Sequence, residues 1–128
     1  MKISDFLIEN NIGNNLEKEI IVSNRFADEN GNFIPFKVRS IDSIELKDIK
    51  RLSRNDEMLI DIHLVANACV EPNFNSVELQ NHYGVKNAFD LVQKVLLPGE
   101  INILSMQILK LSGYGMPFEK ILEEAKKQ

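Results

Sequence analysis

The chain has 128 residues, of which 44% are hydrophobic and 27% are charged, and its formal net charge at pH 7 is −4. These values predict one folded domain spanning residues 1–128 and exclude a disordered or fibrous chain. No apolar run approaches the roughly 18 residues that cross a bilayer. The first residues also lack the pattern of a secretion signal, so we expect an intracellular protein.

The charge is unevenly distributed along the chain. Residues 37–54 sum to +3, whereas residues 55–109 sum to −5. The basic side chains of the first segment are Lys37, Arg39, Lys47, Lys50, Arg51 and Arg54. Three acidic residues are interleaved with them, which favours a solvated helix face and strand ends over a nucleic-acid site. Contact with nucleic acid or an acidic partner remains the alternative interpretation of this segment.

Residue types that carry most protein chemistry are few. The single cysteine, Cys69, excludes an internal disulfide, and one cysteine with two histidines cannot complete a zinc site of Cys and His ligands. We expect Cys69 in the core, on a different helix face from His63, and His82 at the end of a helix. No carboxylate pair and no glycine-rich phosphate loop stands out. The sequence therefore predicts no catalytic residue, no cofactor and no metal.

The N-terminal third predicts an arm followed by two strands. Residues 1–17 form an arm or a short helix, since Ile3, Phe6 and Leu7 share one helical face. Residues 18–41 read as a β-hairpin whose loop is residues 28–32.

Alternation of apolar residues predicts the register of this hairpin. It pairs Phe26 with Ile34, Asn24 with Phe36, and Val22 with Val38. The odd-length loop then places Gly31 in the left-handed region. Pro35 lacks an N–H donor, so its strand lies at an edge or turns the Pro35 nitrogen away from its neighbour.

Residues 42–128 predict a mostly helical part with five or six helices. Asp42, Asn75 and Asn87 each precede an acidic residue by three positions, as helix N-caps do. The expected helices span about 43–54, 56–70, 76–84, 88–97, 98–112 and 117–127. The fold class is therefore α+β, with an N-terminal β-hairpin followed by a mostly α-helical bundle.

The helix expected at residues 98–111 is apolar on most of its circumference. Such a helix is either central to the core or uses its second side on a partner. The candidate partner-binding residues are Ile101, Leu104, Met106, Ile108 and Leu111.

Two groups of residues form a characteristic pattern along the chain. The first is the hairpin, residues 20–26 closing through Asn30 and Gly31 into residues 34–39. The second is a series of short strings in order, at residues 70–74, 78–80, 83–85, 96–100 and 111–113. In order and spacing, this pattern resembles the XkdN-like tail assembly chaperones of phages and PBSX-type prophages. The likeness spans residues 18–113 and departs from the family at residues 54–56, where the family carries a longer insert.

The resemblance implies a non-enzymatic chaperone that binds the tape measure protein, keeps it soluble and helps recruit tail tube subunits. A frameshifted longer form of the chain would contact the tube protein. The site of action would be the host cytoplasm, with no nucleic-acid or membrane partner, and the chain would be absent from the mature tail. Two alternatives stay open, a nucleic-acid-binding phage regulator that uses the basic helix 43–54, and a structural tail component. A homo-oligomer is also left open.

Overall fold

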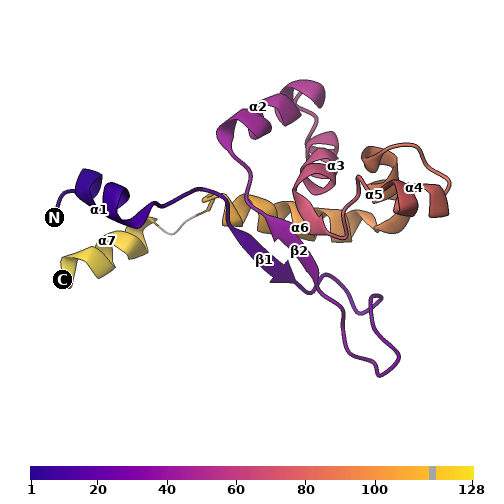
Figure 1. The fold of residues 1–128 in the computed structure, drawn as a ribbon, viewed down its shortest axis with the longest axis horizontal. Helices are drawn as coiled ribbons and strands as arrows, with labels where there is room; N and C mark the ends of the chain where they lie inside the picture. Colours follow the sequence, from indigo (N-terminus) through magenta and orange to yellow (C-terminus); the bar gives the residue numbers. More distant parts are fainter. Residues whose placement is uncertain (116–117) are drawn as a thin grey trace.

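The computed structural model describes residues 1–115 and 118–128 and has the predicted α+β class (Figure 1). Its elements in chain order are α1 (Ile3–Asn10), β1 (Glu17–Ile20), β2 (Phe36–Arg39), α2 (Ser43–Leu52), α3 (Glu57–Ala68), β3 (Cys69–Glu71), α4 (Val77–His82), α5 (Ala88–Val95), α6 (Pro98–Leu111) and α7 (Phe118–Lys126). In the described residues, six helices follow the hairpin, in agreement with the expectation. The predicted start of the last helix, residue 117, lies outside the described residues.

The hairpin belongs to a three-stranded antiparallel sheet of order β1-β2-β3. Phe36 and Val38 point into the core, whereas Lys37 lies on the other face, with its Nζ 3.1 Å from Glu17 Oε2. The third strand was not predicted, because residues 56–70 were expected to be one helix. That helix ends at Ala68, and the chain turns extended at Cys69. Glu71 precedes Pro72, and a residue before proline avoids the helical region.

The predicted register holds at the tip of the hairpin and fails in its body. Ile34 N donates to Phe26 O over 2.8 Å, as the predicted pairing requires. In the body, however, Phe36 pairs with Ile20 rather than with Asn24. Between the paired strands and the tip, the first side of the hairpin (residues 20–26) is therefore four residues longer than the second side (residues 34–36). Since four is an even number, Ile20, Val22, Phe36 and Val38 are still buried together. Ile34, near the tip, is 49% exposed, so the predicted apolar face does not extend to it.

The same shift affects Val38, which pairs with Lys18 and not with Val22. Val22 is nevertheless buried. The edge position that Pro35 suggested is wrong, because β2 is the central strand and Pro35 lies just before it. At the tip, Gly31 has a φ of +80°, as predicted, and its N–H donates to the carbonyl of Asp28.

Helix starts follow the local capping chemistry. Asp42 accepts from Glu45 N, and Asn87 accepts from Asp90 N, each over 2.8 Å. The cap of α4 is Ser76, whose Oγ accepts from Leu79 N, and not Asn75 as expected.

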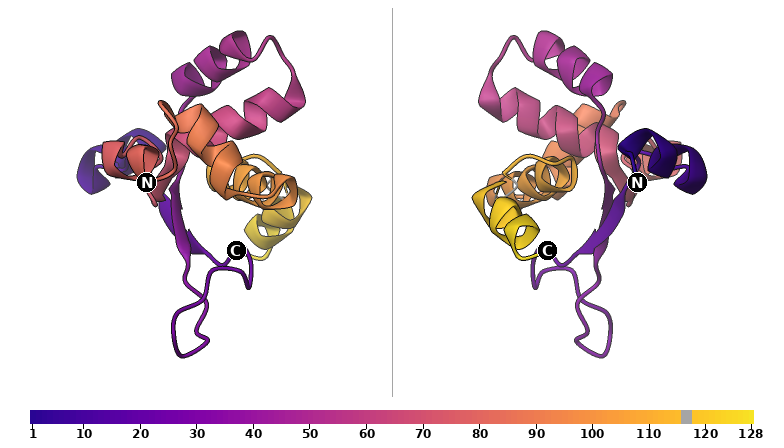
Figure 2. Two further views of the ribbon diagram at one scale, coloured as in Figure 1. Left: turned by 90° about the vertical axis from the view of Figure 1, so that its right-hand side faces the viewer. Right: turned by 90° about the vertical axis from the view of Figure 1, so that its left-hand side faces the viewer.

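The core lies between one face of the sheet and helices α3 and α6, with α5 packed on α3 (Figure 2). Its fully buried members include Val38, Leu64, Leu91, Leu104 and Ile108. Burying an aliphatic side chain of this size stabilises a fold by about 1.5–3 kcal/mol relative to exposing it. Helix α6 is thus held from both the sheet and α3.

Candidate partner-binding surfaces

Helix α6 divides the predicted partner-binding residues between the core and the surface. Ile101, Leu104 and Ile108 are buried, the last two completely. Met106 is 48% exposed, and Leu111 is half-buried at the end of the helix. In this fold, Leu104 and Ile108 are therefore inaccessible, Ile101 exposes 7% of its surface, and Met106 offers the most apolar surface.

Ile103, which was not among the predicted residues, is exposed three positions before Met106 on the same side of α6. Side chains three apart on a helix are neighbours. Sequence spacing placed Ile103 outside the main stripe but did not show which side of the helix the core would cover.

The N-terminus of α6 is held by an ion pair that the sequence did not predict. The buried Glu100 carboxylate accepts from Arg25 Nη2 over 2.6 Å, from Arg25 Nε over 3.0 Å and from Leu97 N over 2.8 Å. Arg25 also donates to the carbonyl of Val95. Hydrogen bonds from Arg25 lower the pKa of Glu100 to about 2, outweighing burial, which raises it. This contact joins α6 to the part of the hairpin, between Ile20 and Phe26, that contains the four extra residues.

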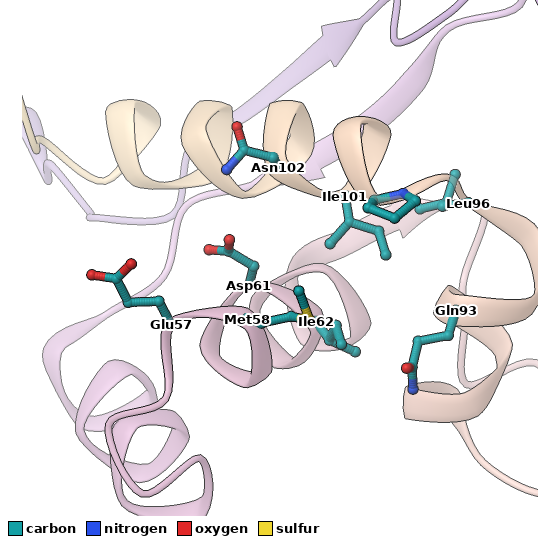
Figure 3. Close-up of a pocket in the computed structure, with 9 residues that line it drawn as sticks. Glu57, Met58, Asp61, Ile62, Gln93, Leu96, Ile101 and Asn102 are labelled. Carbon is teal, nitrogen blue, oxygen red and sulfur yellow. The ribbon is translucent and has the colours of Figure 1, made fainter.

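A groove of about 410 Å³ lies between α3 and α6 and is bordered by the end of α5 (Figure 3). Its floor is apolar, since Ile62, Leu96 and Ile101 each expose less than a tenth of their surface. Met58 lies beside this floor and is 69% exposed. The full lining is Glu57, Met58, Asp61, Ile62, Gln93, Leu96, Pro98, Ile101 and Asn102.

Polar side chains gather at one end of this groove. Figure 3 shows Glu57 and Asp61 of α3 there, with Asn102 of α6 above them. The hydroxyl of Ser105, itself buried in α6, donates to Asp61 Oδ1 over 2.6 Å and fixes that carboxylate at the groove. The lining contains two carboxylates and no Lys or Arg.

The groove was not predicted from the sequence, although the spacing of residues in α3 indicates one of its walls. Glu57 and Asp61 are spaced four apart, as are Met58 and Ile62, so an acidic row runs beside an apolar row. The opposite wall of the groove is formed by α6, about 40 residues further along the chain.

Each of the two terminal helices also exposes apolar side chains. Helix α1 has no buried residue, although it carries Ile3, Phe6 and Leu7, and α7 exposes Ile121 and Leu122. Both helices lie at the same end of the molecule (Figure 1), but on different sides of the sheet (Figure 2). Their apolar faces are therefore not buried against each other.

A hollow of about 680 Å³ lies at the base of these helices. Leu16 from the N-terminal arm, Ile41 and the end of α6 line it. Leu111, one of the predicted binding residues, contributes to this lining. The hollow thus joins the N-terminal arm to the C-terminal end of α6.

The residues considered as candidates for catalysis or metal binding pack against other parts of the chain. Cys69 is buried, its Sγ lies 3.6 Å from the Lys37 carbonyl, and burial raises the pKa of its thiol to about 12. The His63 ring packs against Phe89, and burial lowers its pKa. Across residues 1–115 and 118–128, no three His, Cys, Asp or Glu side chains gather in a way that would hold a metal ion.

Half of the basic residues between 37 and 54 are in ion pairs. Besides Lys37, Arg39 pairs with Glu45 over 2.7 Å, and Arg51 pairs with Asp48 over 3.2 Å. Interleaved carboxylates thus neutralise part of this segment, as the sequence indicated. Within the described part of the chain, no helix is long and apolar enough to span a membrane.

Taken together, the three-stranded sheet, the long central α6 and the uncovered terminal helices define a small α+β domain with apolar surface left open. The sequence model of the phage XkdN-like tail assembly chaperone protein matches residues 3–126. The chain therefore belongs to the XkdN-like family of phage tail assembly chaperones, as its resemblance indicated.

Two relatives come from Bacillus subtilis (strain 168). The uncharacterized protein YqbN and the phage-like element PBSX protein XkdN are each 27% identical over 124 residues, covering 86% of this chain and 83% and 84% of their own lengths. A crystal structure of the protein YqbN superimposes with a TM-score of 0.73 at 22% identity, over 89% of this chain and 98% of that one. At this identity the structural likeness shows a shared fold.

Proposed function

We propose that this chain is a non-enzymatic chaperone that binds the tape measure protein in the host cytoplasm, keeps it soluble and helps recruit tail tube subunits. Membership of the tail assembly chaperone family supports the chaperone role. The observation that carries the proposed client is the uncovered apolar face of α1, together with that of α7.

A long helical rod with apolar stripes is a suitable client for such surfaces. Amphipathic helices bind by laying their apolar faces against apolar surface on a partner. Helix α1 has no buried residue, and Phe6 and Leu7 are 38% and 48% exposed, so contact with another molecule would remove further apolar surface from water. Burial of apolar surface contributes roughly 25 cal/mol per Å², which favours this association.

Binding of several copies to one rod strengthens the proposal. Each additional contact on the same rod acts at a high effective concentration, so weak individual contacts give strong overall binding. The net charge of −4 keeps the bound copies soluble. Recruitment of tail tube subunits by a longer, frameshifted form of the chain belongs to the same proposal.

The test is co-expression of the full chain with the tape measure protein of the same phage or prophage. We expect the tape measure protein to stay soluble and to copurify with the chain. The double variant Phe6→Asp/Leu7→Asp should reduce copurification without changing the thermal unfolding of the body, because α1 has no buried residue. Ile44→Asp, on the exposed face of α2, is the control.

Two results would contradict this function. One is a tape measure protein that is equally soluble with and without the chain. The other is detection of the chain by mass spectrometry at stoichiometric amounts in purified mature tails, which would instead indicate a structural tail component.

A further inference from the structure

We propose that the groove between α3 and α6 binds an amphipathic helix of a partner protein that carries Lys or Arg beside its apolar stripe. The inference rests on the proposed function in taking the tape measure protein as the natural source of this helix. The apolar floor and the acidic rim of the groove support this occupant independently.

The floor fits apolar side chains of a helix. Ile62, Leu96 and Ile101 form a continuous apolar base, and Met58 stands beside it with most of its surface exposed. Methionine has three rotatable bonds and a polarisable sulfur, so it adapts to differently shaped neighbours. The lining side chains come from both α3 and α6 (Figure 3), so apolar side chains of a partner helix lying across the two could enter the groove.

The rim selects the charge of the occupant. Glu57 and Asp61 lie one helical turn apart, about 6 Å along the axis of α3. Lys or Arg residues spaced four apart on a partner helix would meet both carboxylates. Asp61 is already oriented by Ser105, so little side-chain freedom is lost when it binds a cation.

The same charge argues against the terminal helices of a second copy of this chain as the occupant. Helix α1 has a net charge of −2 and α7 a net charge of −1. Either one would bring carboxylates towards Glu57 and Asp61 and would be repelled. A second copy would also offer α2, which exposes Ile44 and Leu52 and carries Lys47 and Arg51 four positions apart, so the oligomeric state is one of the outcomes tested below.

The test uses the full chain and two labelled synthetic helical peptides as probes. One peptide consists of leucines on one face with lysines on both flanks, and the other has glutamate in place of each lysine. Fluorescence anisotropy should show that the leucine-lysine peptide binds about tenfold or more tightly than the leucine-glutamate peptide, because the rim is acidic. Its binding should weaken as salt is raised.

Matched variants locate the site. Met58→Asp should weaken binding of the leucine-lysine peptide about tenfold. Ile44→Asp should leave it unchanged. Met58 and Ile44 both occupy the second position of a helix and are 69% and 72% exposed, so the two changes are equivalent in helix context.

A second pair of variants tests the charge. Glu57→Gln combined with Asp61→Asn removes both carboxylates while the asparagine keeps an acceptor for Ser105. We expect this variant to lose the preference for lysine over glutamate, whereas Glu78→Gln, in the first turn of α4, keeps it.

Three outcomes would overturn the groove proposal. They are equal binding of both peptides, equal effects of Met58→Asp and Ile44→Asp, and a wild-type dimer that Met58→Asp dissociates, which would assign the groove to a second copy. Failure of the proposed function is distinguishable, since the peptide would then bind while the tape measure protein failed to copurify. If the tape measure protein copurifies equally with wild type and with Met58→Asp, its binding does not use the groove.

Discussion

The Glu100→Gln variant tests the ion pair that fixes the N-terminus of α6. Glutamine keeps an oxygen for Leu97 N but places an amide beside the Arg25 guanidinium in place of a carboxylate. The pKa of Glu100 falls from 4.5 to about 2 in the folded chain. At 1.36 kcal/mol per pKa unit, this shift corresponds to about 3 kcal/mol of folding free energy. Because the Arg25 side chain is 43% exposed and the pair is screened by solvent, we expect Glu100→Gln to lower the free energy of unfolding by about 2 kcal/mol.

The pH dependence distinguishes charge from packing. A carboxylate whose pKa is lowered on folding contributes stability that is complete above its unfolded pKa of about 4.5 and is lost as pH falls towards 2. In urea unfolding followed by circular dichroism, the free energy of unfolding of the wild type should therefore exceed that of Glu100→Gln by about 2 kcal/mol at pH 7 and by much less near pH 2. Asp48→Asn, in an exposed pair, should cost less than about 1 kcal/mol. An equal gap at both pH values would refute the electrostatic explanation.

Two further predictions concern burial. Leu104→Ala should lower the free energy of unfolding by about 2–5 kcal/mol, because the side chain is fully buried. Met106→Ala on the same helix should change it by less than about 0.5 kcal/mol, because that side chain is exposed. Equal urea midpoints for the two variants would contradict the assignment of Leu104 to the core and Met106 to the surface. The Cys69 thiol, with its pKa near 12, should fail to react with Ellman's reagent at pH 8 in the folded chain and react fully in urea; rapid labelling of the folded chain would show that Cys69 is accessible.

Local chemistry explains which parts of the fold could be predicted from sequence. Asp42 and Asn87 cap their helices through contacts three residues away, and Gly31 adopts the conformation that its turn requires. The third strand was missed because its pairing with β2 joins Cys69 to Val38, which no local pattern displays. The hairpin register was wrong in a part of the chain that also makes a long-range contact, since Arg25 binds Glu100, 75 residues away.

The candidate site was harder to predict than the fold. Each residue of the groove is ordinary on its own helix, and the site arises only when α3 and α6 are placed side by side. In α6, the apolar pattern left a core role and a partner-binding role open and did not distinguish buried Leu104 from exposed Met106. That distinction depends on which side of α6 faces the sheet and α3, which tertiary packing decides.

The burial of α6 also constrains how a client can be bound. Leu104 and Ile108 are fully enclosed, so a partner that contacted them would have to separate α6 from α3 and the sheet and expose the core. An aspartate at either position would bury an unpaired charge and unfold the domain, so lost binding there would carry no information about a surface. Under the proposed function, the terminal helices and the groove are therefore the surfaces on which to test client binding, since Phe6, Leu7 and Met58 can be changed there while the core stays intact.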